Sequence, residues 1–435
     1  MKKISFYLVN LILIISFSKG VLELIGIPPN ISQLTIDVLI LTFFIISFIF
    51  ILRKGGVVFA VGLVHVFLFI VFIIISYLLN ETNYIELLLF VRALLIYYLF
   101  FYALLNTPFT KEEKDVFVKV LIILFLVQIP AAFIKLILLG GTLEKIVGTV
   151  SIGEGSLATV MPLVAIAFLI SKYLVYKNIK YIILVLFFIS IGLISNKLGI
   201  LFYVVFLFIF ITYLYSSKKS SGGINFIFFK KMTLTSIYIS VIVALFISLN
   251  PRANPEHKIG GSIDLDYLIT YTQHYNTLKL KGSRVEADGR SDAPFVAFNK
   301  LSNGGLLNIL VGYGPGDIIK SMFSKYKDPL LAKYNIGYGG RLGLVWVMMQ
   351  VGLVGVFIFL LFHLYVFYRA YYFYKYIDSN NKEELYLSIF FLSIVIIYFL
   401  DFFTYSSKMI HSPSVAITYF FSIYYLFSYE KEKMK

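Results

Sequence analysis

The sequence predicts an all-α protein, a polytopic transmembrane helical bundle of about 12 spans with one large extracytoplasmic loop between spans 9 and 10. The first observation is composition: 60% of the 435 residues are hydrophobic, 14% are charged and the mean hydropathy is +0.89. A soluble chain of this length could not bury that much apolar surface. The second is the repeated occurrence of apolar runs of about 17–22 residues, which span hydrocarbon as helices. The third is one polar stretch of about ninety residues, from residue 250 to 340, among connections that are otherwise roughly twenty residues or shorter.

The apolar runs define the individual spans. They are expected near residues 4–18, 34–52, 57–79, 85–105, 116–138, 157–176, 180–194, 198–215, 232–249, 341–368, 385–403 and 412–428. The first run is expected to be an uncleaved helix rather than a signal peptide, because Asn10 interrupts it and no clear cleavage site follows. The chain therefore divides into spans 1–9 (residues 1–249), the outer segment (residues 250–340), and spans 10–12 with a tail (residues 341–435).

The positive charges predict the orientation of these spans. Lys and Arg gather in alternate connections, for example at Arg53–Lys54, Lys230–Lys231 and Arg369. By the positive-inside rule both termini are cytoplasmic and the outer segment faces outward. The same distribution accounts for the net charge of +15. A nucleic-acid partner is therefore not expected, since no basic helix or nucleic-acid motif is present.

Two absences from the sequence restrict the chemistry. The chain contains no Cys, which excludes disulfides, thiolate metal sites and Cys nucleophiles. Its five His residues do not show metal-ligand spacing, and no His-Glu-x-x-His or Ser-His-Asp arrangement occurs. No metal and no cofactor are expected.

The outer segment carries eleven Lys or Arg and eight Asp or Glu. Its centre contains Arg284, Glu286, Asp288, Arg290 and Asp292. A guanidinium group matches the geometry of phosphate oxygens, and a neighbouring carboxylate is suited to general-base catalysis. The alternative for any one of these residues is a solvated surface with salt links.

Three further cations lie near or inside the predicted membrane. Lys197 lies in a tight turn on the outer side, Arg341 begins the helix after the outer segment, and Arg92 lies well inside the fourth span. A cation at membrane depth is costly and usually faces a cavity or a partner. Arg92 has the alternative of pairing with Asp37 or of extending toward the interface.

Gly312-Tyr313-Gly314-Pro315-Gly316-Asp317 is only superficially similar to a nucleotide-binding loop. It lacks the Gly-x4-Gly-Lys-Ser/Thr order and lies on the side without nucleotides. We expect a turn whose backbone comes close to a helix or a ligand.

With these residues in view, the chain resembles the O-antigen ligase and O-antigen polymerase superfamily of bacterial envelope glycan assembly. The family's short Ser-Arg-Gly-like turn is similar to Ser195–Gly199, with Lys197 where Arg is usual. Its Gly-Arg and later Gly-x-Gly resemble Gly289–Arg290 and Gly312–Gly316, and its Gly-Leu-x-Gly resembles Gly352–Gly355. Ligases of the family carry a His-Asn pair where this chain has Arg341-Leu342, so the resemblance favours a polymerase.

The resemblance implies a metal-independent glycosyltransferase, in which a sugar hydroxyl attacks the anomeric carbon of a polyprenyl-diphosphate-linked oligosaccharide. It implies stabilisation of the leaving diphosphate by Arg290, Arg341 and Lys197, and glycan binding by Arg284. The general base stays open among Asp288, Asp292, Glu286 and His274. The expected catalytic residues are thus Arg290, Arg341, Asp288 and Asp292, and the expected substrate-binding residues are Lys197, Arg284, Glu286, His274 and Arg92.

The resemblance further implies the bacterial cytoplasmic membrane, a groove lined by Phe and Leu for the isoprenoid tails, contact with membrane lipid, and a chain-length regulator as a partner. Three alternatives stay open. A ligase would transfer the finished glycan to a lipid or protein acceptor. A flippase for lipid-linked oligosaccharide has no need of so large an outer segment. A transporter should show inverted repeats and buried carboxylates.

Overall fold

A computed structural model describes residues 2–54, 62–139, 147–152, 156–194, 199–219, 289–319 and 328–433, with short pieces between 244 and 270. Over these ranges the chain forms helices joined by turns and no strand. The all-α expectation is therefore confirmed for the described part of the protein.

The helices lie close to the predicted spans. They are α1 (Lys2–Leu24), α2 (Pro29–Lys54), α3 (Leu63–Asn80), α4 (Tyr84–Asn106), α5 (Lys111–Leu139), α6 (Leu157–Tyr176), α7 (Lys180–Ile194), α8 (Gly199–Lys219), α11 (Ala293–Asn303), α12 (Leu306–Val311), α13 (Pro329–Tyr334), the 3₁₀ helix η2 (Tyr338–Arg341), α14 (Gly343–Tyr376), α15 (Lys382–Leu400), the π-helix η3 (Asp401–Tyr405), α16 (Lys408–His411) and α17 (Pro413–Lys433). In the described residues, 8 helices are long and apolar enough to cross a membrane. The span expected at 232–249 lies outside the described residues, so the number of crossings stays a prediction.

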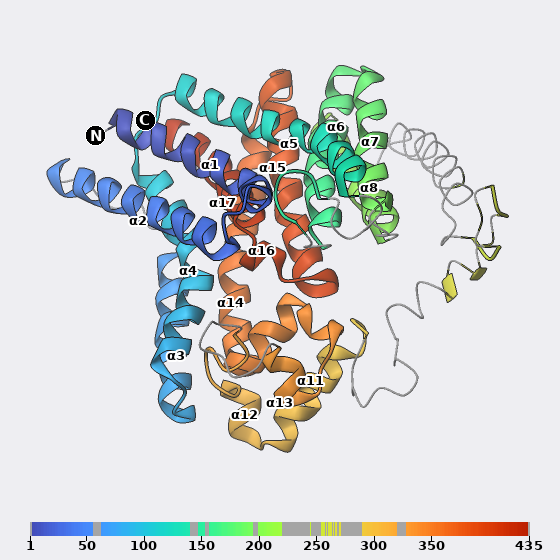
Figure 1. Cartoon of the computed structure of the whole chain (residues 1–435). Helices are drawn as coiled ribbons and strands as arrows, with labels where there is room; N and C mark the ends of the chain where they lie inside the picture. The colour runs from blue at the N-terminus through green and yellow to red at the C-terminus, as the bar shows by residue number, and fades with distance from the viewer. Residues whose placement is uncertain are drawn as a thin grey trace.

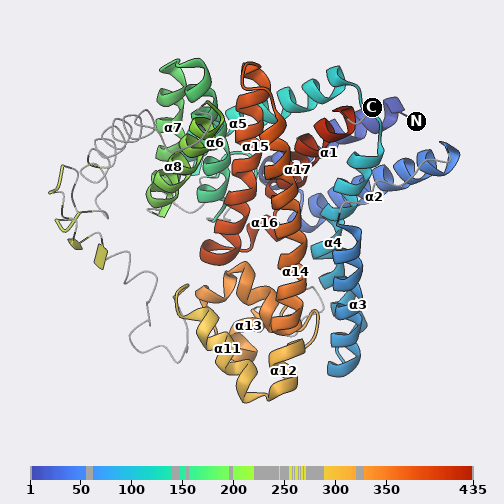
Figure 2. The same cartoon turned by 180° about the vertical axis from the view of Figure 1, so that it is seen from behind.

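Helix α14 contacts helices from both halves of the chain. It packs against α3, α12 and α17 along its length, while α6 packs against α7, α8 and α15. Figure 1 shows α3, α14 and α15 running in one direction and α1, α2 and α5 lying across it, and Figure 2 shows the same arrangement from behind. The described helices thus cross at large angles rather than forming a bundle of parallel rods.

Aromatic rings fill the spaces between the helices. The Phe125 ring lies 5.3 Å from the Phe17 ring and 6.4 Å from the Phe390 ring, in both cases edge to face. Such contacts add stabilisation beyond the area that the rings bury. They join α5 to α1 and to α15, so part of the high Phe content serves helix packing.

The described second half of the outer segment is helical rather than an extended loop. Helices α11, α12 and α13 gather at one end of α14 (Figure 1). Local sequence explains α13, because Asp328 Oδ1 accepts a hydrogen bond from Leu331 N–H (3.2 Å) and Pro329 occupies the first turn. Packing of α11 and α12 on α14 fixes this half of the outer segment to the membrane-embedded part.

Candidate functional site

Arg290 lies at the start of α11 and contacts a tyrosine from a distant part of the chain. Its Cζ is 4.5 Å from the centre of the Tyr405 ring, at the end of η3. The Tyr405 hydroxyl accepts a hydrogen bond from Thr159 (2.7 Å), and its ring meets the Tyr203 ring edge to face at 5.9 Å. The aromatic ring beneath Arg290 is therefore held by α6 and α8, and it attracts the cation through its negative face.

The segment that carries Arg341 lies beside the same turn. It is exposed at the end of η2, two residues before α14 begins. Gly343 N–H, at the start of α14, donates to the Ser406 carbonyl (3.3 Å), and η2 also packs against α11. We call Arg290, Arg341, Tyr405 and Ser406 the Tyr405 site. It brings together both arginines that the sequence analysis expected to be catalytic, although about fifty residues separate them in the chain.

Asp401 stabilises the turn that carries Tyr405 and Ser406. Its side chain is 3% exposed, accepts a hydrogen bond from the Ser406 hydroxyl, and accepts another from Met409 N–H (2.9 Å). Ser406 N–H donates back to the Asp401 carbonyl (2.9 Å), which closes the wider π-helical turn. Sequence reasoning did not select Asp401, because an Asp near the end of an apolar run carries no motif.

Helix α16 continues from this turn and brings His411 against Trp346. The two rings meet edge to face at 4.5 Å, and the other face of Trp346 stacks on Phe90 at 5.2 Å. Trp346 lies one turn after Gly343, so the histidine lies near the start of α14. The sequence analysis treated His411 as scattered, since its position beside α14 depends on the fold of α16.

The same segment also borders an apolar pocket. The pocket is lined by side chains of α3, α4, α14, α15, α16 and α17. Met409 and Ile410 of α16 form part of its wall, with Phe359 and Phe362 among the aromatic lining residues. A pocket lined by apolar rings in a membrane protein suits a hydrocarbon chain. The groove for isoprenoid tails that the resemblance implied stays a prediction.

One polar cluster of the pocket wall, centred on His363, is internally bonded, whereas the buried Nδ1 of His65, another lining residue, has no hydrogen-bond partner among the described residues. His363 is 3% exposed, and its Nδ1 lies 2.8 Å from the Tyr419 hydroxyl while its Nε2 lies 3.0 Å from the Tyr398 hydroxyl. Burying a polar group without such partners costs free energy. The two tyrosine hydroxyls therefore satisfy the hydrogen-bonding groups of the buried His363 ring, which explains this arrangement.

The glycine-rich loop is a packing device, as the sequence analysis expected. Gly352 has φ +65 and interrupts α14, which leaves the preceding carbonyls without helical donors. Tyr313 N–H donates to the Met349 carbonyl (2.9 Å) and Gly314 N–H to the Gln350 carbonyl (3.1 Å). The backbone of the outer segment thus replaces the missing helical bonds of α14.

Asp317, Lys333 and Tyr334 form a hydrogen-bonded cluster beside this loop on the outer segment, which we call the polar clasp. Lys333 Nζ lies 2.6 Å from Asp317 Oδ1, and the Tyr334 hydroxyl donates to Asp317 Oδ2 (2.6 Å). Burial, followed by this hydrogen bond, raises the pKa of Tyr334 well above its usual value. The clasp joins α13 to the glycine loop and keeps Tyr334 protonated.

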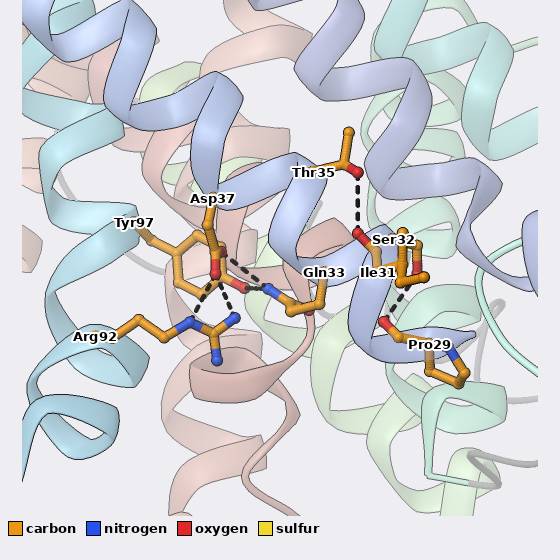
Figure 3. A network of polar contacts seen from close by, with 8 residues as sticks. All are labelled: Pro29, Ile31, Ser32, Gln33, Thr35, Asp37, Arg92 and Tyr97. Carbon is orange, nitrogen blue, oxygen red and sulfur yellow. Dashed lines mark hydrogen bonds and ion pairs between the residues drawn. The ribbon is translucent and has the colours of Figure 1, made fainter. Parts of the chain in front are cut away.

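Arg92 is engaged by a carboxylate (Figure 3). Its Nη2 and Nε lie 2.5 and 2.6 Å from Asp37 Oδ2, and Gln33 Nε2 donates both to Asp37 Oδ1 (3.2 Å) and to the Tyr97 hydroxyl (3.3 Å). Asp37 is 6% exposed, so the pair compensates a buried charge. The geometry matches the pairing alternative for Arg92 and does not join it to the Tyr405 site.

The other expected site residues are distributed as follows. Asp292 is half-buried at the N-cap of α11, two residues after Arg290, and makes no capping hydrogen bond with its side chain. Five lie outside the described residues: Lys197, His274, Arg284, Glu286 and Asp288. Within the described ranges, no group of three or more His, Cys, Asp or Glu is placed to hold a metal ion.

Comparison with known proteins adds no family assignment. No protein-family model matches the chain, and no curated protein matches it.

Proposed function

We propose that this protein is a polymerase that joins polyprenyl-diphosphate-linked oligosaccharide units on the outer face of a bacterial cytoplasmic membrane. The observation that carries the proposal is the position of residues 405–411. This segment contacts Arg290 through the Tyr405 ring, bonds through the Ser406 carbonyl to the start of α14 just after Arg341, and contributes Met409 and Ile410 to the wall of the apolar pocket. A cationic site next to an apolar pocket suits an amphiphile with an anionic head and a hydrocarbon tail.

The proposed reaction transfers a glycan from its lipid carrier. A hydroxyl of the incoming unit forms a bond to the anomeric carbon, the bond from that carbon to the diphosphate oxygen breaks, and the hydroxyl proton passes to a base. Negative charge develops on the leaving lipid diphosphate. Preorganised cations directed at that charge lower the barrier, which is the role proposed for Arg290 and Arg341.

Asp292 is the candidate base that the described residues bring closest to this site along the chain. It follows Arg290 by two residues and is half-buried without a capping bond. The other candidate bases stay open, because Asp288, Glu286 and His274 lie outside the described residues.

Deletion of the gene tests the proposal. The surface glycan and the pool of lipid-linked intermediates of the deletion strain are separated by electrophoresis beside those of the strain complemented with the wild-type gene. A polymerase predicts loss of long chains, with a single repeat on the final acceptor or on the carrier at the outer face. Long chains retained on the carrier would instead indicate a ligase, and repeats held on the cytoplasmic face a flippase. An unchanged glycan would refute all three.

A further inference from the structure

We propose that Asp401 is a positioning residue that sets the separation of Arg290 and Arg341, and thereby makes the Tyr405 site selective for a diphosphate over a monophosphate. The ligand class rests on the proposed function. The positioning itself is argued from the hydrogen bonds of Asp401 alone.

The first step concerns how the Asp401 carboxylate is used. It is buried and accepts hydrogen bonds from the Ser406 hydroxyl and Met409 N–H, which lie five and eight residues further along the chain. A buried carboxylate is costly unless donors satisfy its oxygens. The turn between η3 and α16 supplies those donors, so the carboxylate and the turn conformation depend on each other.

The second step connects this turn to the arginines. Tyr405 directly precedes Ser406, and its ring lies against the Arg290 guanidinium. The Ser406 carbonyl receives Gly343 N–H at the start of α14, directly after Arg341 and Leu342. One carboxylate therefore fixes the two adjacent residues against which the two arginine-bearing segments rest.

The third step explains why the separation matters. A single phosphate can be bound by one guanidinium fork, whereas a diphosphate gains from two cations held at the spacing of its two phosphorus centres. If the turn relaxes, a diphosphate loses the second cation, while a monophosphate loses little. Selectivity is thus the property that responds to positioning.

The experiment measures equilibrium binding of inorganic pyrophosphate and inorganic phosphate to the purified full-length protein in detergent. The variants are Asp401→Asn, which keeps the side-chain shape but sets an amide against Met409 N–H or the Ser406 hydroxyl, and Ser406→Ala, which removes one donor. Ser393→Ala is the matched control, because this buried hydroxyl of α15 donates only to the Ile389 carbonyl of its own helix (2.7 Å).

We expect Asp401→Asn to weaken pyrophosphate binding about tenfold, the size of one unsatisfied buried hydrogen bond, with little change for phosphate. Ser406→Ala should act in the same direction, and Ser393→Ala should leave both affinities at the wild-type values. In an Arg290→Ala background the effect of Asp401→Asn should disappear, because the positioned cation is absent.

Three results would overturn the inference: a wild-type protein without preference for pyrophosphate, an Asp401→Asn protein with unchanged selectivity, or an equal loss of both ligands. The last is what a purely structural role predicts. The outcome is independent of the glycan analysis. Reduced pyrophosphate selectivity with an unchanged glycan in the deletion strain would retain the positioning role and refute the polymerase, and the converse results would do the opposite.

Discussion

At the scale of single residues, the arginines of this protein differ in what opposes their charge. Arg92 is bound through two nitrogens to Asp37, so its charge is compensated within the helices. Arg290 lies over the Tyr405 ring, and a guanidinium over an aromatic face keeps in-plane N–H donors for other partners. The proposed catalytic role therefore belongs to Arg290 and not to Arg92, whose charge is already compensated.

Arg290→Ala and Arg341→Ala should each lower polymerisation by about 100-fold or more, since each leaves diphosphate charge uncompensated in the transition state. Membrane insertion should be retained. Glycan length on a gel, normalised to the amount of protein in the membrane, measures the effect. Lys300→Ala, at the other end of α11, is the control and should preserve wild-type chains. Wild-type chain length in both arginine variants would contradict the assignment.

The Asp37–Arg92 pair makes a prediction about stability rather than catalysis. Asp37→Asn should lower the free energy of unfolding by about 1–3 kcal/mol, because a charged hydrogen bond is lost and Arg92, 40% exposed, is only partly resolvated. Adding Arg92→Gln should restore part of the loss. Thermal unfolding in detergent measures both, with Thr35→Val on the exposed face of α2 as the control. Equal stability of Asp37→Asn and wild type would show that the pair contributes nothing.

At the scale of elements, irregular helix segments determine where the outer segment and the membrane helices meet. The break at Gly352 opens α14 to the glycine loop, and the π-helix η3 turns the chain toward α16. A regular helix would satisfy its own carbonyls and present no backbone partner at either place. Both irregularities lie beside the Tyr405 site or the loop next to it, as is common for functional positions.

The loop contact predicts a difference between two glycines of the outer segment. A Cβ at Gly312 (φ +75) would lie 2.5 Å from the Gln350 carbonyl carbon, whereas a Cβ at Gly305 (φ +97) meets nothing within 4 Å. Gly305→Ala should therefore cost roughly 1–2 kcal/mol of backbone strain. Gly312→Ala should cost roughly 3 kcal/mol or more, because overpacking adds to the strain. Thermal unfolding of both variants in detergent provides the measurement, and equal midpoints would argue against the close contact.

At the scale of the whole molecule, α14 joins the two ends of the protein. Its 34 residues extend about 50 Å, more than the roughly 30 Å of bilayer hydrocarbon. Helices α11–α13 gather at its first end. At its last end, Lys218 Nζ binds the carbonyls of Lys375 and Ile377 at 2.6 and 2.7 Å, a favourable place for a cation at a helix C-terminus. We therefore predict that the two ends lie on opposite sides of a membrane.

The natural absence of cysteine makes this orientation directly testable. Ser302→Cys, in the last turn of α11, should react with a membrane-impermeant maleimide added to intact cells or spheroplasts. Ser379→Cys, in the turn after α14, should react only after the membrane is permeabilised. Ser302 is exposed and Ser379 is half-exposed, so access to the reagent is controlled by the membrane. The reverse labelling pattern would invert the topology and remove the site from the outer face.

The sequence by itself determined the helical class and nearly every long apolar helix of the described residues, because helices satisfy their hydrogen bonds locally and apolar run length is set by the bilayer. It also indicated a close backbone approach at Gly312–Gly316, since glycine at such density signals positive φ or tight contact. Three features were decided only by the tertiary structure. The segments that carry Arg290 and Arg341 meet at Tyr405, Asp401 is buried beneath them, and Arg92 pairs with Asp37. Each joins segments far apart in the chain, and the free energy of such contacts depends on distances and burial that no local pattern encodes.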